Sequence, residues 1–126
     1  MQPTQTLKIA IVDDSMFMRR MVRSAVKECF PAAELLEYGD GQAAIEQLPA
    51  ESPDLILLDL LMPRLNGQDT LAQLRALGVK SPIIVVTADV QQSVRDRVRE
   101  LGAQGFIQKP ITYEKLKTVL GEVMSS

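Results

Sequence analysis

One carboxylate stands inside an otherwise apolar segment, DLILLDLLMP, which spans residues 54–63. Asp59 follows four aliphatic residues and precedes two leucines and a methionine. A carboxylate in such surroundings costs free energy unless it is paired, bound to a metal or placed where the segment meets solvent. We therefore expect Asp59 to lie at a solvent-facing end of this segment and to take part in chemistry.

Reactive polar residues also end three of the other apolar runs. These residues are Asp13 and Asp14 after LKIAIV (7–12), Thr87 at the end of PIIVVT (82–87) and Lys109 at the end of GFIQK (105–109). Taken singly, each has a plainer interpretation. An aspartate after a strand is more often a turn former or a helix N-cap than a metal ligand, a threonine suits a strand, and a lone lysine is a solvated charge. Their recurrence at the same end of successive runs favours a common site.

The apolar runs alternate with segments of helical periodicity, which indicates an α/β fold. Strands are expected at residues 7–12, 33–38, 54–59, 82–87 and 105–109. The expected helical stripes are Met18, Met21, Val22, Ala25, Val26 and Cys29; Ala43, Ala44, Ile45 and Leu48; Leu71, Leu74 and Leu77; Val94, Val98 and Leu101; and Leu116, Val119, Leu120 and Val123. Breakers, among them Gly41, Pro49, Gly67 and Gly105, are expected between these elements.

Near-continuous apolar strands are typical of a parallel sheet that helices cover on both faces. Right-handed crossovers place the C-terminal ends of all the strands at one edge, where ligands bind in open α/β sheets. The sequence therefore predicts a single doubly wound sheet of five parallel strands with five helices. The reactive residues would meet at one rim of that sheet.

Three carboxylates at one rim repel one another, and a single ammonium offsets them only in part. At about 4 Å and an effective dielectric constant near 20, each like-charged pair costs roughly 4 kcal/mol. A hard divalent cation would remove this penalty, and Mg²⁺ suits a small site that keeps several waters. A metal, a nucleophilic carboxylate, a lysine and a hydroxyl are the parts needed to transfer a phosphoryl group.

Composition excludes several classes of function. The net charge of −2 gives no support for binding nucleic acid through bulk charge, and no apolar run reaches the roughly 18 residues of a transmembrane helix. The absence of histidine excludes a His-based zinc site, a Ser-His-Asp triad and a histidine phospho-carrier within the chain. The single cysteine, Cys29, is expected in the core and fits a cytoplasmic protein. We expect one domain over residues 1–126, with a core of about 7–124 and loose ends.

Five motifs together resemble a known family. IVDDS, LILLDLLMP, NG, VVTA and FIQKP occur in the order and spacing of the receiver domain of bacterial response regulators, over about residues 7–124. The segment DDSMFMRRMVRSAV resembles most closely the stand-alone chemotaxis receivers of the CheY type. This resemblance implies the flavodoxin-like strand order 2-1-3-4-5, which is the order known for CheY itself.

The resemblance assigns roles by position. Asp59 is similar to the phospho-acceptor, whose carboxylate forms an acyl phosphate. Asp13 and Asp14 resemble the acidic pair that holds Mg²⁺, and the backbone carbonyl of Leu61 resembles the third protein ligand beside Asp59. Thr87 and Lys109 are then expected to bind phosphoryl oxygens, and the resemblance implies a cis peptide bond before Pro110.

The resemblance also implies a switch. The family's switch aromatic, three residues before the lysine, is often tyrosine and is Phe106 here, so a hydroxyl contact to a partner would be lost. Leu61 and Asp89 stand at positions that affect the access of hydrolytic water in the family. Output is expected through the fourth helix, the fifth strand and the fifth helix, where Arg95, Arg97 and Arg99 form either a solvated face or a contact for an acidic partner.

The partners implied are a sensor histidine kinase or a phosphotransfer protein on the input side and a motor switch or relay protein on the output side. We expect a chemotaxis or motility receiver, with a phosphorelay intermediate or the receiver of a larger multidomain regulator as alternatives. The chain is expected to be a monomer, and the output face is the surface for any dimer. Neither nucleic acid nor membrane is an expected partner.

Three other classes of protein fit the residues less well. A phosphatase or phosphomutase usually needs a second acid two residues beyond its nucleophile, where this chain has Leu61. A flavin-binding module needs a Ser/Thr/Gly-rich loop after the first strand, where this chain has two aspartates. A degenerate receiver that acts as a scaffold disagrees with the intact set of reactive residues. We therefore expect no enzyme activity beyond self-phosphorylation and slow self-dephosphorylation.

Overall fold

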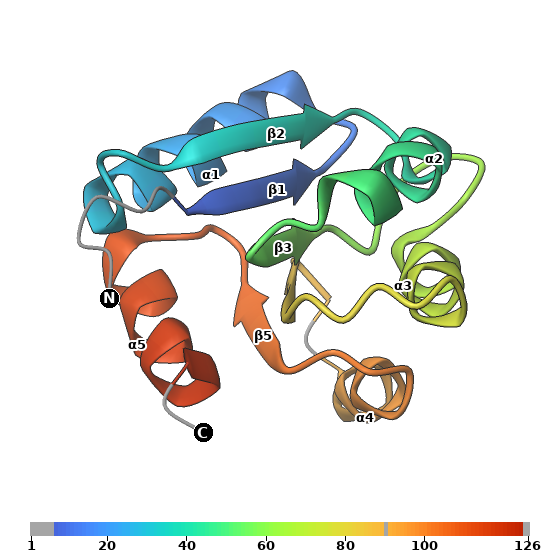
Figure 1. Cartoon of the computed structure of the whole chain (residues 1–126). Coiled ribbons are helices and arrows are strands. Elements are labelled where there is room, and N and C mark those ends of the chain that lie inside the picture. The colour runs from blue at the N-terminus through green and yellow to red at the C-terminus, as the bar shows by residue number, and fades with distance from the viewer. Residues whose placement is uncertain (1–6, 90, 125–126) are drawn as a thin grey trace.

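The computed structural model describes residues 7–89 and 91–124, so the expectation of loose ends falls largely outside the described residues. The elements are β1 (Lys8–Val12), α1 (Met16–Cys29), β2 (Glu34–Tyr38), α2 (Gly41–Glu51), β3 (Leu55–Leu58), α3 (Gly67–Ala76), β4 (Ile83–Thr87), α4 (Gln92–Glu100), β5 (Gly105–Gln108) and α5 (Tyr113–Met124). The strands pair in parallel in the order β2-β1-β3-β4-β5 (Figure 1). The predicted doubly wound fold is confirmed.

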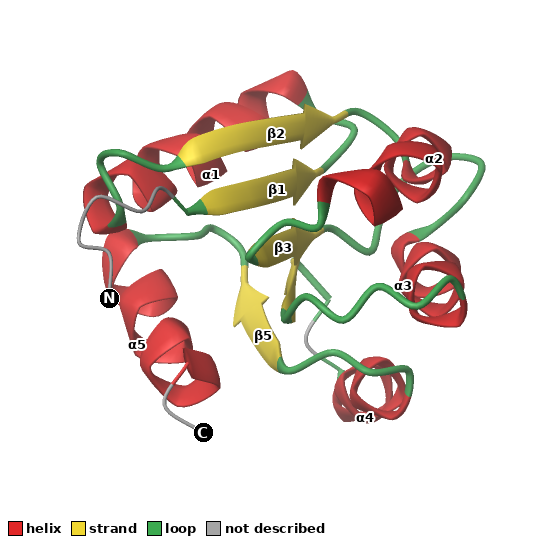
Figure 2. Ribbon diagram, viewed as in Figure 1, coloured by secondary structure: helices red, strands yellow, loops and turns green. Residues whose placement is uncertain are grey.

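Helices cover both faces of this sheet. Figure 2 shows α1 and α5 on one side of the strands and α2, α3 and α4 on the other. Side chains under α1 and α5 are Ile9, Ile11, Leu55, Leu57, Ile84, Val86 and Ile107. The opposite face presents Ala10, Val12, Ile56, Leu58, Ile83 and Val85. Because neither face is exposed, the central strands are apolar at successive positions, which explains the unbroken runs in the sequence.

The first helix begins and packs as its sequence predicts. Ser15 caps α1, because its hydroxyl accepts a hydrogen bond from the amide of Met18 at 3.2 Å. The buried residues of this helix are Val22, Ala25 and Val26. Burying each valine contributes about 1.5–3 kcal/mol, which anchors α1 on the sheet and limits the movement of the short loop before it.

Some expected breakers and stripes are wrong. Pro49 lies inside α2 instead of after it, because a proline in the last turn forfeits only one intrahelical hydrogen bond. Leu77 lies beyond the end of α3 and is 55% exposed, since the chain turns away at Gly78 with a φ of 88°. Two glycines, Gly41 and Gly67, are the first residues of helices and not parts of connections, whereas Gly105 begins β5 where the strand is expected to begin.

Candidate functional site

The carboxyl edge of the sheet holds the backbone of the candidate residues in place. Three of them donate the hydrogen bond that follows the last paired residue of their strand. These bonds run from the amide of Asp13 to the carbonyl of Tyr38 (3.1 Å), from Asp59 to Val12 (2.9 Å) and from Lys109 to Thr87 (2.8 Å). Each side chain therefore projects beyond the sheet from a backbone that the sheet fixes.

Three carboxylates converge at this edge. Asp13, Asp14 and Asp59 each offer one oxygen such that the three oxygens lie within 4.8 Å of one another. Asp14 is exposed, but Asp13 and Asp59 are only 3% and 4% exposed. The expectation that Asp59 meets solvent is therefore wrong. The β3–α3 loop brings Gly67 against the backbone carbonyl of Asp59, and Lys109 covers the carboxylate.

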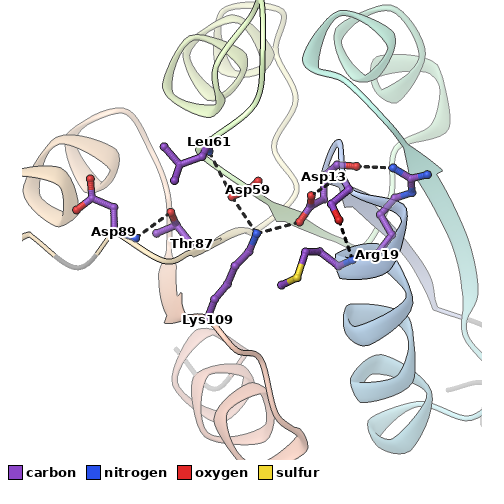
Figure 3. A network of polar contacts seen from close by, with 9 residues as sticks. Asp13, Arg19, Asp59, Leu61, Thr87, Asp89 and Lys109 are labelled. Carbon is purple, nitrogen blue, oxygen red and sulfur yellow. Dashed lines mark hydrogen bonds and ion pairs between the residues drawn. The ribbon is translucent and has the colours of Figure 1, made fainter.

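Lys109 joins the two buried carboxylates, as Figure 3 shows. Its Nζ lies 3.2 Å from Asp13 Oδ2 and 3.3 Å from Asp59 Oδ1. Burial and then the charge of Asp13 raise the pKa of Asp59 above its ordinary value, while Lys109 and the amide of Leu61 act in the opposite direction. The protein's own cations thus leave the acidic cluster incompletely neutralised.

The loop that carries the acidic pair is held from several sides. The amide of Ser15 donates to Asp13 Oδ1 at 2.9 Å, which orients that carboxylate. Arg19 Nη1 donates to the backbone carbonyl of Asp13 at 2.6 Å (Figure 3). On its other side, Arg19 Nε lies 3.3 Å from Glu37 Oε1. Arg19 lies off the apolar stripe of α1, a position that is typical of a solvated charge. Periodicity could not identify it, since its partners lie on other elements.

Thr87 and the residues around the acceptor have separate contacts. Thr87 is fully buried, and its hydroxyl accepts a hydrogen bond from the amide of Asp89 at 3.3 Å. The amide of Leu61 donates to Asp59 Oδ1 at 3.3 Å, while the Leu61 side chain is 62% exposed (Figure 3). The peptide bond between Lys109 and Pro110 is cis, as the resemblance implies.

The residues expected to carry the output lie apart from the acidic cluster. Phe106 is half-buried in β5, and the guanidinium carbon of Arg95 in α4 lies 4.9 Å from the centre of its ring. Arg99 is exposed and lines, with Arg95 and Phe106, a shallow depression between α4 and β5. Arg97 pairs with Glu100 on the same helix at 3.5 Å. The structure therefore forms two places from the predicted set: an acidic cluster and an α4–β5 surface.

The acidic cluster has the chemistry of a site for a hard cation. Carboxylate oxygens are the ligands that Mg²⁺ prefers, and Asp13, Asp14 and Asp59 supply three of them close together. Lys109 could contact an anion held on the same side, since its Nζ already lies between two carboxylates. The residues present thus fit a divalent metal beside a small charged group such as phosphoryl.

The strand order and this cluster define the receiver class of α/β protein. A family model described as the response regulator receiver domain matches residues 9–121, so the chain belongs to the response regulator receiver family. Among the described residues, every helix is too short or too polar to span a bilayer.

Relatives with different names share this domain. Response regulator MprA of Mycolicibacterium vanbaalenii is 36% identical over 112 residues, which cover 87% of this chain but 47% of MprA, so the chain spans about half of that protein. Chemotaxis protein CheY of Listeria monocytogenes is 33% identical over 114 residues, which cover 90% of this chain and 95% of CheY. The structure of Vibrio cholerae CheY4 matches with a TM-score of 0.82 at 25% identity, covering 94% of this chain and 99% of that one. These relatives define a family and not a pathway.

Proposed function

We propose that Asp59 accepts a phosphoryl group, and that the chain is a phosphorylation-controlled receiver. The observation that carries this proposal is the placement of a buried aspartate between an acidic pair and the ammonium of Lys109 at the carboxyl edge of the sheet. Nothing in hydrophobic packing requires that arrangement, because an isolated buried carboxylate destabilises a fold. A site that transfers a charged phosphoryl group, in contrast, needs carboxylates and an ammonium close together.

The residues around Asp59 have distinct tasks in this proposal. Lys109 and the amide of Leu61 engage Oδ1, which leaves Oδ2 without a hydrogen-bond partner among the described residues and available to attack phosphorus. Mg²⁺, held by Asp13, Asp14, Asp59 and the carbonyl of Leu61, would neutralise charge on the phosphoryl oxygens. Lys109 then pairs with one phosphoryl oxygen, and the hydroxyl of Thr87 donates to another.

Thr87 and Phe106 would connect the acceptor to the output surface. A phosphoryl group adds a charge of roughly −1.5 to −2, which attracts Lys109 and the Thr87 hydroxyl. Movement of Thr87 away from the amide of Asp89 opens space toward β5, into which Phe106 turns. Arg95 and Arg99 then present a changed surface to a partner, and couplings of about 1–3 kcal/mol change affinity by five- to 150-fold.

Membership of the family implies a histidine kinase or another phosphodonor and a downstream target. We propose a protein donor that carries phosphohistidine, because this chain has no histidine. A chemotaxis role is supported by the similarity to a CheY protein along 95% of its length, and a relay protein or a multidomain regulator is the alternative, supported by MprA. We further propose one cytoplasmic receiver domain that acts as a monomer, binds no nucleic acid and turns over no small-molecule substrate.

A mass measurement tests the acceptor directly. The protein is incubated with Mg²⁺ and acetyl phosphate, and its intact mass is compared with that of Asp59→Asn and of the control Asp54→Asn. Asp54 precedes the same strand at the opposite edge of the sheet, where its carboxylate accepts from the amide of Lys8 at 2.8 Å. We expect a gain of about 80 Da in the wild type and the control, and none in Asp59→Asn. An equal gain in Asp59→Asn would overturn the proposal.

A further inference from the structure

Arg19 makes a set of contacts that the phosphoryl-transfer proposal does not use. Its side chain is 16% exposed and reaches from α1 to the residue after β1 and to a residue of β2. Nη1 donates to the carbonyl oxygen of Asp13 at 2.6 Å, and Nε lies 3.3 Å from Glu37 Oε1 in β2. A hydrogen bond of that length from a cation belongs to the strong, charge-assisted kind. Arg19 therefore fixes one particular peptide group.

That peptide group joins the two neighbouring aspartates. The amide of Asp13 is held by β2, and the amide of Ser15 is held by the Asp13 carboxylate at 2.9 Å. Between these two points the Asp13–Asp14 peptide is the remaining unit, and its carbonyl bonds to Arg19. Rotation of this peptide would swing the exposed Asp14 carboxylate relative to Asp13, because the side chain of Asp14 follows the peptide plane.

We propose that Arg19 is a positioning residue for the acidic pair: through the Asp13 carbonyl it holds the Asp14 carboxylate in reach of a divalent cation. Glu37 supports this arrangement, because it pairs with the other side of the Arg19 guanidinium and directs it toward the β1–α1 loop. The inference rests on the proposed role of Asp13 and Asp14 as metal ligands. It adds a residue that touches neither metal nor phosphoryl group.

Loss of Arg19 has two opposing effects on the affinity for Mg²⁺. A cation near an acidic cluster repels a second cation, so loss of its charge alone would tighten Mg²⁺ binding. Glu37 lies 3.3 Å from Arg19 and offsets part of that charge. Loss of the hydrogen bond to Asp13 would instead weaken binding, because the ligand oxygens would no longer be held together. We infer that the second effect is larger.

Arg23 provides a matched control on the same helix. Its Nη1 also pairs with Glu37, at 3.4 Å to Oε2, but Arg19 alone of the two bonds to the Asp13 carbonyl. Calorimetric titration with MgCl₂ compares the wild type with Arg19→Ala, Arg19→Lys and Arg23→Ala. We expect the dissociation constant to rise about tenfold in Arg19→Ala, as for residues that orient metal ligands, and to stay within about twofold in Arg23→Ala. Arg19→Lys should recover part of the affinity, since an ammonium can reach one acceptor.

A measurement without metal separates this inference from the proposed function. Nuclear magnetic relaxation of the metal-free protein reports the order of the Asp14 and Ser15 amides. We expect these two amides to become more mobile in Arg19→Ala and to stay unchanged in Arg23→Ala, with thermal unfolding confirming that both variants are folded. Equal effects of the two variants, or tighter Mg²⁺ binding by Arg19→Ala, would overturn the inference. A wild type that binds no Mg²⁺ would refute the metal site, while the relaxation data would still decide whether Arg19 orders the loop.

Discussion

At the carboxyl edge of the sheet one lysine faces two buried carboxylates, whereas at the opposite edge a half-buried arginine faces no carboxylate within the part of the chain described. The acceptors of Arg75 are the carbonyl oxygens of Gly102 (2.8 Å), Val79 (2.8 Å) and Ser81 (2.9 Å) and the amide oxygen of Gln104 (2.9 Å). They come from the α3–β4 and α4–β5 connections, so one side chain ties two loops to the end of α3.

The two edges differ in what burial does to charge. Burial lowers the pKa of Arg75, but its ordinary value is so high that the guanidinium stays charged, and carbonyl oxygens satisfy it. Burial together with Asp13 raises the pKa of Asp59, and one lysine does not offset both. The comparison teaches that the polar network at one edge stabilises the fold, while unfavourable electrostatics is concentrated at the edge where chemistry is proposed.

The largest expected effect lies at the stabilising edge. Arg75→Ala leaves several partly buried acceptors without a donor, and each unsatisfied group costs about 1–3 kcal/mol, so we expect a loss of about 4 kcal/mol in the free energy of unfolding. Urea unfolding followed by circular dichroism measures it. The control Arg97→Ala removes an exposed arginine and should change little. A loss below about 1 kcal/mol in Arg75→Ala would show that this edge does not stabilise the fold.

A steric change at the carboxyl edge comes next. The amide of Gly67 donates to the carbonyl of Leu60 at 2.9 Å, and an added Cβ would overlap the backbone of Asp59 and Leu60. We expect Gly67→Ala to lower the free energy of unfolding by about 3 kcal/mol and to slow phosphorylation from acetyl phosphate. In Gly121→Ala the new Cβ meets no atom within 4 Å among the described residues beyond its own stretch of helix, and a helical alanine should be neutral or stabilising. Equal stability of the two variants would contradict the close packing behind Asp59.

A smaller effect of opposite sign is expected from the acceptor itself. Asp59→Asn removes one of two buried like charges, so the metal-free protein should become more stable at neutral pH, by on the order of 1 kcal/mol. Thermal unfolding in a chelating buffer measures this gain. A destabilised variant would mean that the ion pair with Lys109 outweighs the repulsion from Asp13. The electrostatics around Asp59 would then stabilise the fold, as the contacts of Arg75 do at the opposite edge.

The smallest effect is a pH dependence. The pKa of Asp59 is raised in the folded state from an ordinary value of 3.8, so the folded protein binds the proton more tightly than the unfolded chain. Stability relative to Asp59→Asn should therefore be highest at low pH and fall as pH rises from the ordinary pKa to the raised one. Parallel denaturation curves of the two proteins across that window check the slope. A difference that rises with pH would reverse the assigned sign.

Much of the fold could be predicted from the sequence because the strands are buried on both faces. The runs at residues 55–58 and 83–86 are apolar at each successive position, and every expected strand boundary lies within one residue of the observed one. The strand order rested on the resemblance, since apolar runs carry no information on which strands are neighbours. The convergence of Asp13, Asp14, Asp59 and Lys109 followed from the parallel arrangement.

The parts that could not be predicted depend on long cationic side chains. Arg19 and Arg75 both lie off an apolar stripe, a position at which solvated charges are the usual outcome. Their methylene stems reach acceptors on other elements, and in the sequence Gly102 is 27 residues from Arg75. The burial of Asp59 was missed for a related reason, because the covering groups come from Lys109 and from the β3–α3 loop.

The amides of Asp13, Asp59 and Lys109 extend the pairing of the sheet by one step past the strands. Every amino acid except proline can donate that bond, whatever its side chain. Exchange of a side chain at these three positions therefore leaves the backbone pairing in place. A sheet terminated in this manner can acquire or lose chemistry through single substitutions, with the architecture inherited unchanged.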